Sequence, residues 1–254
     1  MEYWTPASAL VIVAHPDDIE FSCAGTVARW TREGARVSYA LLTNGAAGSS
    51  DPEMTRERLA SLREAEQRAA AKVVGVERVD FLGYEDGLLE PTLELRKQVV
   101  RLIREVRPEV VVTTDPTTRW FGDSYINHPD HRAAGEVTLA AVIPGSDTRL
   151  AYPELLDEGL EPVKLKGVWL MMNTEPNLVV DVSEVMDKRI ESLRCHVSQL
   201  VEEPGDNDIE FVYQMASWSA AGQPFRYGEA FKVFRFDQPW EPPREAAEGR
   251  QVEQ

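Results

Sequence analysis

The chain has 254 residues and a formal net charge of −16, with 28% of its residues charged. A surface this acidic repels phosphate backbones and anionic lipid, so we expect neither a nucleic-acid partner nor a membrane partner. Two cysteines, Cys23 and Cys195, are too few for a disulfide framework and favour a reducing compartment, so we expect a cytoplasmic protein.

Short apolar runs alternate with longer amphipathic runs along the chain. In chain order, the predicted strands are residues 9–14, 36–42, 78–82, 109–113, 167–172, 177–182 and 231–236. The predicted helices are residues 20–34, 55–74, 91–106, 128–143, 183–200 (with Ser183 as its N-cap) and 211–221. Strands that alternate with helices predict an α/β fold with a mainly parallel, Rossmann-like sheet and helices on both faces.

The same pattern bears on domain organisation. No internal repeat or clear linker interrupts it, so we expect a single domain over residues 1–238. Residues 239–254 are rich in Glu, Pro, Arg and Gln and contain one valine as their only larger aliphatic residue. This composition predicts an acidic, disordered tail.

Two segments rich in ionisable residues follow predicted strands. The sequence HPDD occupies residues 15–18 after the first strand, and NHPDHRAAG occupies residues 127–135 beyond the fourth strand and its loop. These segments hold three of the four histidines in the chain. Ligands of open α/β sheets bind beyond the carboxyl ends of strands, so we expect the two segments to meet there. Their imidazoles and carboxylates predict a divalent-metal site suited to hydrolysis.

These segments also allow other interpretations. Asp17 and Asp18 could do no more than cap the helix that follows them. A dinucleotide-binding protein is disfavoured, because its first turn needs glycines, and the carboxylates here would repel a pyrophosphate. A relative that keeps the fold and only binds ligands is disfavoured by the presence of a complete set of candidate metal ligands.

The motifs also indicate a family. AHPDDIE, at residues 14–20, resembles the AHPDDE signature of the LmbE-like, or PIG-L, family of zinc-dependent N-deacetylases, and HPDHRAAG is similar to that family's second motif. Residues 62–87 and 227–236 resemble the family's middle region and C-terminal strand. The resemblance implies the LmbE-like fold. This sequence departs from the family signature at Ile19, which places Glu20 one position later than the glutamate of the signature. A supporting role for Glu20 is therefore left open.

The resemblance implies a reaction and a metal. His15, Asp18 and His131 would bind one Zn²⁺ per chain, although such a ligand set accepts other divalent metals. Asp17 would be the general base for the attacking water. The implied reaction removes an acetyl group from the amide nitrogen of an N-acetylglucosamine-type conjugate, a small molecule. A metal-dependent amidase for another acyl group or a natural product stays open as the alternative.

Further roles follow from the same resemblance. His128 would stabilise the oxyanion and deliver a proton to the leaving amine, and Asp130 would orient a histidine. Arg63, Asp86 and Asn44 would bind the substrate. For Arg63 the alternative is a solvated helix charge, and for Asp86 it is a turn residue.

The remaining histidine is interpreted differently. His196 is adjacent to Cys195, and adjacent side chains on a helix diverge by about 100°, so the two would not bind one ion. We therefore interpret His196 as structural. Family members are often oligomers, so the resemblance also implies a homo-oligomer.

Overall fold

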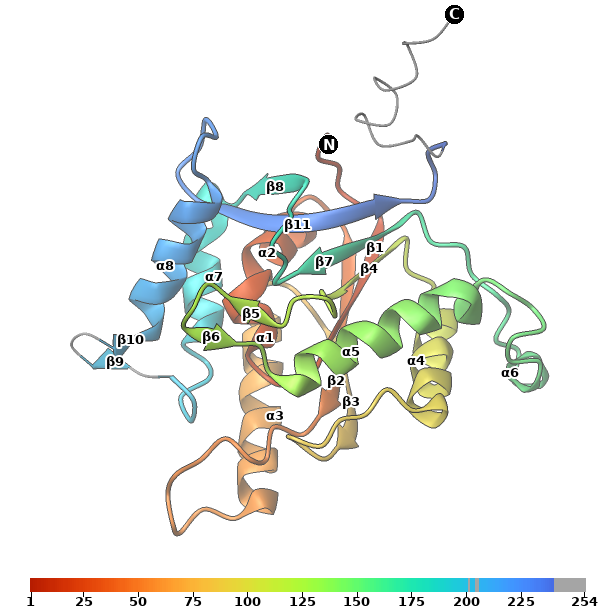
Figure 1. Ribbon diagram of the computed structural model, residues 1–254, viewed down its shortest axis with the longest axis horizontal. Helices are drawn as coiled ribbons and strands as arrows, with labels where there is room; N and C mark the ends of the chain where they lie inside the picture. Colours follow the sequence, from red (N-terminus) through yellow and green to blue (C-terminus); the bar gives the residue numbers. More distant parts are fainter. Residues whose placement is uncertain (201, 204–205, 240–254) are drawn as a thin grey trace, which may run out of the picture.

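Among residues 1–200, 202–203 and 206–239, which the computed structural model describes, a seven-stranded sheet forms the centre of the fold (Figure 1). Its strands are β1 (Ser8–Val13), β2 (Arg36–Thr43), β3 (Arg78–Tyr84), β4 (Val110–Thr114), β7 (Gly167–Met171), β8 (Leu178–Asp181) and β11 (Gly228–Arg235). The predicted tail lies outside the described residues, except for Pro239.

The sheet order is β3–β2–β1–β4–β7–β11–β8. The first five strands pair in parallel, whereas β11 is antiparallel to both of its neighbours. This arrangement confirms the predicted Rossmann-like sheet. Because β1 and β4 are parallel neighbours at its centre, the segments that follow them leave the sheet at the same edge.

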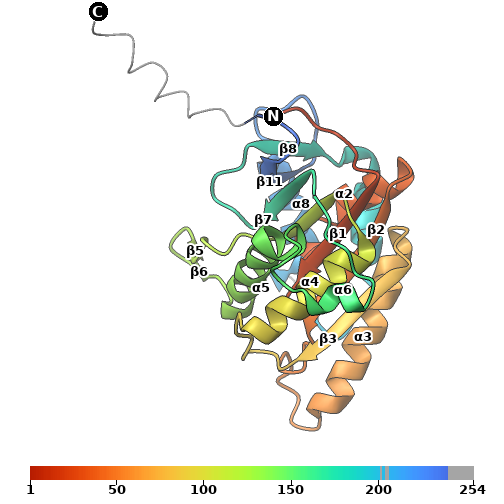
Figure 2. The same cartoon turned by 90° about the vertical axis from the view of Figure 1, so that its right-hand side faces the viewer.

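Helices cover both faces of the sheet (Figure 2). They include α1 (Asp18–Ser22), α2 (Ala24–Arg32), α3 (Arg56–Val73), α4 (Leu93–Val106), α5 (Pro129–Ala140), α6 (Glu154–Asp157), α7 (Met186–Leu193) and α8 (Asp208–Ser219). Helices α4, α5 and α6 pack on one face, and the others pack on the opposite face. Strand β1 is therefore buried on both sides, which explains its uninterrupted apolar sequence.

Some short elements were not predicted. The expected loop at residues 115–127 contains a hairpin of β5 (Trp120–Phe121) and β6 (Tyr125–Ile126). Helix α5 continues into a π-helical turn, η1 (Ala141–Ser146), and a second small hairpin pairs β9 (Glu202–Glu203) with β10 (Asp206–Asn207). In the described part of the chain, no helix combines the length and apolar character needed to cross a bilayer.

The predicted cap at Ser183 is wrong. A 3-10 turn, η2 (Ser183–Val185), precedes α7, and the Ser183 hydroxyl accepts hydrogen bonds from the backbone amides of Arg226 and Tyr227 instead of capping the helix. The helix predicted over residues 183–200 is correspondingly shorter, because the chain after α7 folds into turns.

The predicted helix over residues 20–34 is divided at Cys23, whose φ of −142° and ψ of 9° are not helical. The break leaves the first backbone amides of α2 without partners in the helix, and the buried side chain of Glu229, from β11, accepts hydrogen bonds from them. The Glu229 carboxylate lies 2.9 Å from the Gly25 amide and 2.6 Å from the Thr26 amide. An anion at a helix N-terminus also complements the helix dipole, so Glu229 stabilises the start of α2.

The C-terminal end of α1 is stabilised by a positive charge, that of Arg189. Arg189 of α7 donates to the carbonyls of Glu20 and Phe21, at 3.1 and 2.6 Å. The same guanidinium lies 3.1 Å from Glu229, and both side chains are at most 3% exposed. One buried ion pair therefore holds both ends of the break, which hydrophobic periodicity alone does not reveal.

We expect Glu229→Gln to lower the free energy of unfolding by about 3 kcal/mol, because it leaves the buried Arg189 charge without its anion. Urea denaturation measures the difference. Glu191→Gln, which removes one partner of the exposed pair with Lys188, is the control and should change stability by less than about 0.5 kcal/mol. Equal unfolding midpoints for Glu229→Gln and the wild type would contradict this role.

Candidate active site

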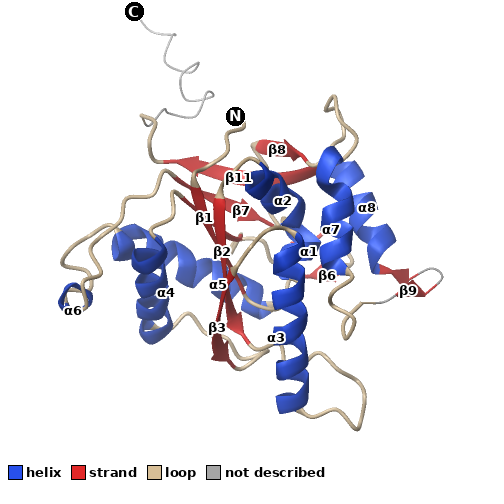
Figure 3. Ribbon diagram, turned by 180° about the vertical axis from the view of Figure 1, so that it is seen from behind, coloured by secondary structure: helices blue, strands red, loops and turns tan. Residues whose placement is uncertain are grey.

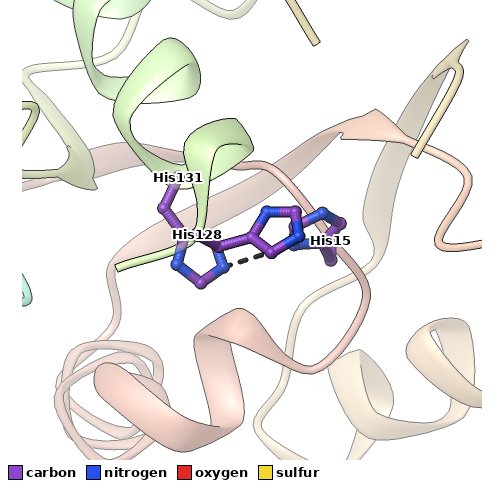
Figure 4. Close-up of side chains that lie close together, drawn as sticks. All are labelled: His15, His128 and His131. Carbon is purple, nitrogen blue, oxygen red and sulfur yellow. Dashed lines mark hydrogen bonds between the residues drawn. The ribbon is translucent and has the colours of Figure 1, made fainter. Parts of the chain in front are cut away.

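The two His-Pro-Asp segments meet at the carboxyl edge of the sheet, as their positions after β1 and β4 predict. Pro129 occupies the first turn of α5, where its fixed φ favours helix initiation, and His128 stands at the N-cap. His128 and His131 therefore lie on the first turn of α5, while His15 comes from the turn after β1 (Figure 4).

Three side-chain atoms surround a common point. His15 Nδ1 lies 3.3 Å from His131 Nε2, and Asp18 Oδ1 lies 3.0 Å from His131 Nε2 and 3.7 Å from His15 Nδ1. A tetrahedral zinc ion with bonds near 2.0–2.1 Å separates its ligand atoms by about 3.4 Å. The three residues are each 7–8% exposed, so water competes weakly for them. The spacing fits a small divalent cation.

The orientation of Asp18 is set by the backbone before it. Its Oδ2 accepts hydrogen bonds from the amides of Ala14 and His15, at 3.1 and 2.9 Å, which turns Oδ1 toward the histidines. Burial raises the pKa of Asp18, but His131 and His15 outweigh this and hold it well below its usual range. Asp18 is therefore an anion whose side chain binds the backbone amides that precede it and does not cap α1.

A hydrogen-bonded chain determines the tautomer of His131. Asn127 donates its Nδ2 to the Thr118 carbonyl at 2.7 Å, so its Oδ1 is the atom that faces His131 Nδ1, at 3.0 Å. His131 Nδ1 therefore carries the proton, and Nε2 offers a lone pair to the common point. Sequence reasoning missed Asn127, although its place four residues before His131 could have indicated this contact across the first turn of the helix.

The second nitrogen of His15 faces two carboxylates. Nε2 lies 3.2 Å from Asp130 Oδ2 and 3.1 Å from Asp86 Oδ1, so it carries a proton and leaves Nδ1 for the common point. Burial lowers the pKa of His15, but the charge of Asp18 and the hydrogen bonds of Asp130, Asp18 and Asp86 outweigh it and raise the pKa to about 12. The cluster thus requires a positive charge, supplied either by a second proton on His15 or by a bound cation.

Asp130 and Asp86 are themselves held by the backbone. Asp130 accepts from the amides of Gly87 and Leu89, at 2.7 and 3.2 Å, and Asp86 accepts from the Ala47 amide at 2.9 Å. Burial raises the pKa of Asp86, whereas the hydrogen bonds from His15 and Ala47 lower it to about 2. Both carboxylates therefore reach His15 as ionised, oriented acceptors.

The Asp17 carboxylate pairs with Arg63 of α3, at 3.1 Å. It adopts a left-handed conformation, with φ 88° and ψ −24°, and its side chain makes no capping hydrogen bond to α1 within the described chain. The interpretation that Asp17 only caps the helix is therefore wrong. Burial raises the pKa of Asp17 to about 6, although Arg63, 3.1 Å away, acts in the opposite direction. Such a group can exchange a proton near neutral pH.

Arg63 of α3 is buried, so the alternative of a solvated helix charge is wrong. Its guanidinium donates to the carbonyls of Pro16 and Gly45, at 2.6 and 2.8 Å, besides Asp17. Gly45 has a φ of +63°, and a Cβ there would lie 2.8 Å from Arg63 Cζ. The loop after β2 therefore needs glycine at this position to let Arg63 reach Asp17.

Asn44 and His128 border this cluster. Asn44 Oδ1 accepts from the Ala46 amide at 3.1 Å and shapes the turn after β2. His128 is half-buried, with its ring centroid 4.7 Å from that of His15, and its Nδ1 accepts from the Asp130 amide at 3.3 Å. Burial and the charge of His15 lower the pKa of His128. Its neutral ring thus carries the proton on Nε2.

Imidazoles and carboxylates that converge at the carboxyl edge of an α/β sheet are typical of metal-dependent hydrolases. A family model described as "PIG-L: GlcNAc-PI de-N-acetylase" matches residues 10–142. The chain belongs to the PIG-L family, and it is an enzyme of the N-deacetylase class, which hydrolyses amide bonds. The resemblance of its motifs to this family is confirmed.

Individual relatives align over most of the chain. The diacetylchitobiose deacetylase of Thermococcus kodakarensis is 33% identical over 223 residues, which cover 88% of this chain and 81% of that protein. A Bacillus anthracis protein named as a probable N-acetyl-α-D-glucosaminyl L-malate deacetylase 2 is 30% identical, covering 75% and 80%. The solved N,N′-diacetylchitobiose deacetylase of Pyrococcus horikoshii matches with a TM-score of 0.82 at 28% identity, covering 91% and 84%.

Proposed function

We propose that the protein is a zinc-dependent deacetylase that removes the acetyl group from an N-acetylglucosamine unit of a small conjugate. The observation that carries this proposal is the convergence of His15 Nδ1, Asp18 Oδ1 and His131 Nε2, which lie 3.0–3.7 Å apart. The names of the relatives, which include chitobiose and glucosaminyl-malate deacetylases, support the amino-sugar substrate.

His15, Asp18 and His131 would hold the metal, which when bound supplies a Lewis acid that acidifies water and polarises the amide carbonyl. Asp17 acts as the general base. Its pKa of about 6 leaves it ionised at neutral pH and still basic enough to accept a proton from the attacking water. The water oxygen bonds to the acyl carbon as this proton moves to Asp17.

His128 supports the charge that develops on the carbonyl oxygen. Because its ring is neutral with the proton on Nε2, it donates a hydrogen bond to the oxyanion and keeps its proton. The leaving amine then takes its proton from Asp17 as the carbon–nitrogen bond breaks. This differs from the expectation that His128 delivers this proton, because the lowered pKa of His128 leaves its ring neutral and without a second proton to give. Asp130 contributes by orienting His15.

We propose different roles for the three residues that were expected to bind the substrate. Arg63 donates to Asp17 and to the carbonyls of Pro16 and Gly45. Asp86 contacts His15 and accepts from the Ala47 amide. Both residues therefore act first by positioning other groups of the site. Asn44 is partly exposed and precedes Gly45, whose carbonyl accepts from Arg63, so it can still meet a sugar hydroxyl. A homo-oligomer and a cytoplasmic location remain predictions.

A substrate panel tests this function. Diacetylchitobiose and N-acetylglucosaminyl conjugates of inositol and malate are incubated with the protein, and acetate and free amine are quantified. We expect acetate release from at least one substrate, loss of release after chelation, and recovery with Zn²⁺. Release of a longer acid from N-acyl glucosamines, without acetate release, would favour the alternative amidase. Full activity in metal-free protein would overturn the proposal.

Arg63→Met should move the acidic limb of the kcat/KM profile to higher pH. The active form of Asp17 is the carboxylate, so activity falls as pH drops through its pKa. Loss of the nearby guanidinium removes an influence that lowers this pKa, so the fall occurs at higher pH. Arg58→Met, at an exposed position of the same helix, is the matched control. An unmoved limb would show that Arg63 does not tune the base.

A further inference from the structure

The backbone of Asp17 is held by a neighbouring helix. A left-handed conformation costs an L-residue other than glycine roughly 1–2 kcal/mol, so surrounding contacts must maintain it. The amide of Asp17, which has a φ of 88°, donates to Gln67 Oε1 at 3.0 Å. Gln67 and Arg63 lie one turn apart on α3, so one face of this helix contacts both the backbone and the carboxylate of Asp17.

The orientation of the Gln67 amide follows from its partners. A backbone N–H can only donate, so Gln67 must present its oxygen to Asp17 and its NH₂ group to the other side. There Nε2 lies 3.1 and 3.3 Å from the two carboxylate oxygens of Glu20. Both Gln67 and Glu20 have no exposed surface, so each depends on the other for its hydrogen bonds.

Glu20 is supported from a third segment. His196, 1% exposed, places its Nε2 3.1 Å from Glu20 Oε2. The turn that carries His196 is tied to α3, because Glu66 accepts from the amide and hydroxyl of Ser198, at 2.8 and 2.7 Å. Figure 3 shows α3 beside α1 and α7, and the turn that carries His196 follows α7.

The position of Ile19 now has a physical reason. Ile19 is fully buried in the apolar cluster between the sheet and its covering helices. The next residue of α1 turns away from it and reaches α3, which brings the Glu20 carboxylate to Gln67. Ile19 thus packs in the core, while the Glu20 side chain belongs to the hydrogen-bonded network behind Asp17.

We propose that Gln67 and Glu20 are positioning residues that hold Asp17 in the left-handed conformation from which its carboxylate serves the reaction. This inference rests on the proposed function, in which Asp17 is the base. Among the described residues, the hydrogen bonds and ion pair of the Gln67 and Glu20 side chains go to the Asp17 amide, to each other and to His196, and none goes to a candidate metal ligand or to the Asp17 carboxylate. We therefore expect their loss to affect the chemical step and to leave metal binding intact.

Gln67→Met tests the network, since it keeps the side-chain length and removes the hydrogen bonds to Asp17 and Glu20. We expect kcat for acetate release to fall by about ten- to a hundredfold, with KM and zinc content unchanged. By NMR, the Asp17 amide should exchange its hydrogen faster than in the wild type. Gln214→Met, at an exposed position of α8, is the control. Wild-type kcat and wild-type exchange in Gln67→Met would overturn the inference.

A charge swap separates positioning from general damage. Gln67→Glu alone places two carboxylates face to face and should lower kcat as Gln67→Met does. Combining it with Glu20→Gln restores the pattern, because the introduced amide donates to the introduced carboxylate, which still accepts from Asp17. We expect the double variant to recover most of the lost kcat. Activity no higher than in Gln67→Glu would contradict positioning through this hydrogen-bonded chain.

The proposed function can fail independently of this inference. If the wild type releases no acetate, or Asp17→Asn stays fully active, the proposed function is wrong, whereas amide exchange at Asp17 still measures the network directly. If Asp17→Asn is inactive and Gln67→Met matches the wild type in kcat and exchange, only the positioning inference is wrong.

Discussion

Asp17→Asn should lower kcat for acetate release by about 10²–10⁴-fold, the usual contribution of a general base. The amide keeps the size of the side chain and can still contact Arg63, but it cannot accept a proton from water. Zinc content should remain near that of the wild type, because Asp17 lies outside the triangle of candidate ligand atoms.

Acetate release and bound zinc are measured on the same preparations. Asp147→Asn, at an exposed position after α5 and η1, controls for the substitution itself. Normal hydrolysis by Asp17→Asn would remove Asp17 from the chemistry and leave another group to activate the water.

His131→Ala should lose both metal and activity. The substitution removes one of the three converging donor atoms, and we expect zinc affinity to fall by more than the 10- to 100-fold that loss of an outer hydrogen bond typically costs. His128→Ala is the matched control from the same turn of α5, and it should retain zinc while losing oxyanion stabilisation. Zinc affinity is measured by competition with a chromogenic chelator. Equal affinities for the two variants would contradict the assignment.

Much of the fold follows from local patterns. The apolar strand 9–14 and the strand 109–113 lie at the centre of a parallel sheet, as alternation with helices predicts. The break at Cys23 could not be predicted, because it depends on Glu229 and Arg189, which are distant in sequence. The hairpin at Trp120–Ile126 is too short to produce a clear periodic signal.

In the candidate site, too, some features could be predicted from the sequence and others could not. The two motifs could be placed together because each follows a strand of the predicted parallel sheet, and the choice of His15, Asp18 and His131 within them came from the resemblance to the family. The support behind them could not be placed, since it comes from side chains without a motif of their own. Gln67 on a charged helix and Asn127 before the second motif have no distinctive local pattern until the fold brings them to Asp17 and His131.

The ring of His15 separates two groups that could each attract a cation. On its Nδ1 side are Asp18 and His131, and on its Nε2 side are Asp86 and Asp130. Backbone amides bind the carboxylates on both sides, but only the Nδ1 side adds a second imidazole, because His131 Nε2 lies 3.3 Å from His15 Nδ1 and 3.0 Å from Asp18 Oδ1. Zinc binds imidazole nitrogen readily, which favours the Nδ1 side. The mechanism depends on this choice, because the proposed base Asp17 is adjacent in sequence to Asp18, which lies on the Nδ1 side.

An anomalous difference map at the zinc edge, from crystals of the zinc-loaded protein, tests this choice most directly. We predict one peak per chain within bonding distance of His15 Nδ1, Asp18 Oδ1 and His131 Nε2. A peak on the opposite side of the ring, between His15, Asp86 and Asp130, or no peak near His15, would contradict a deacetylase built on this triangle.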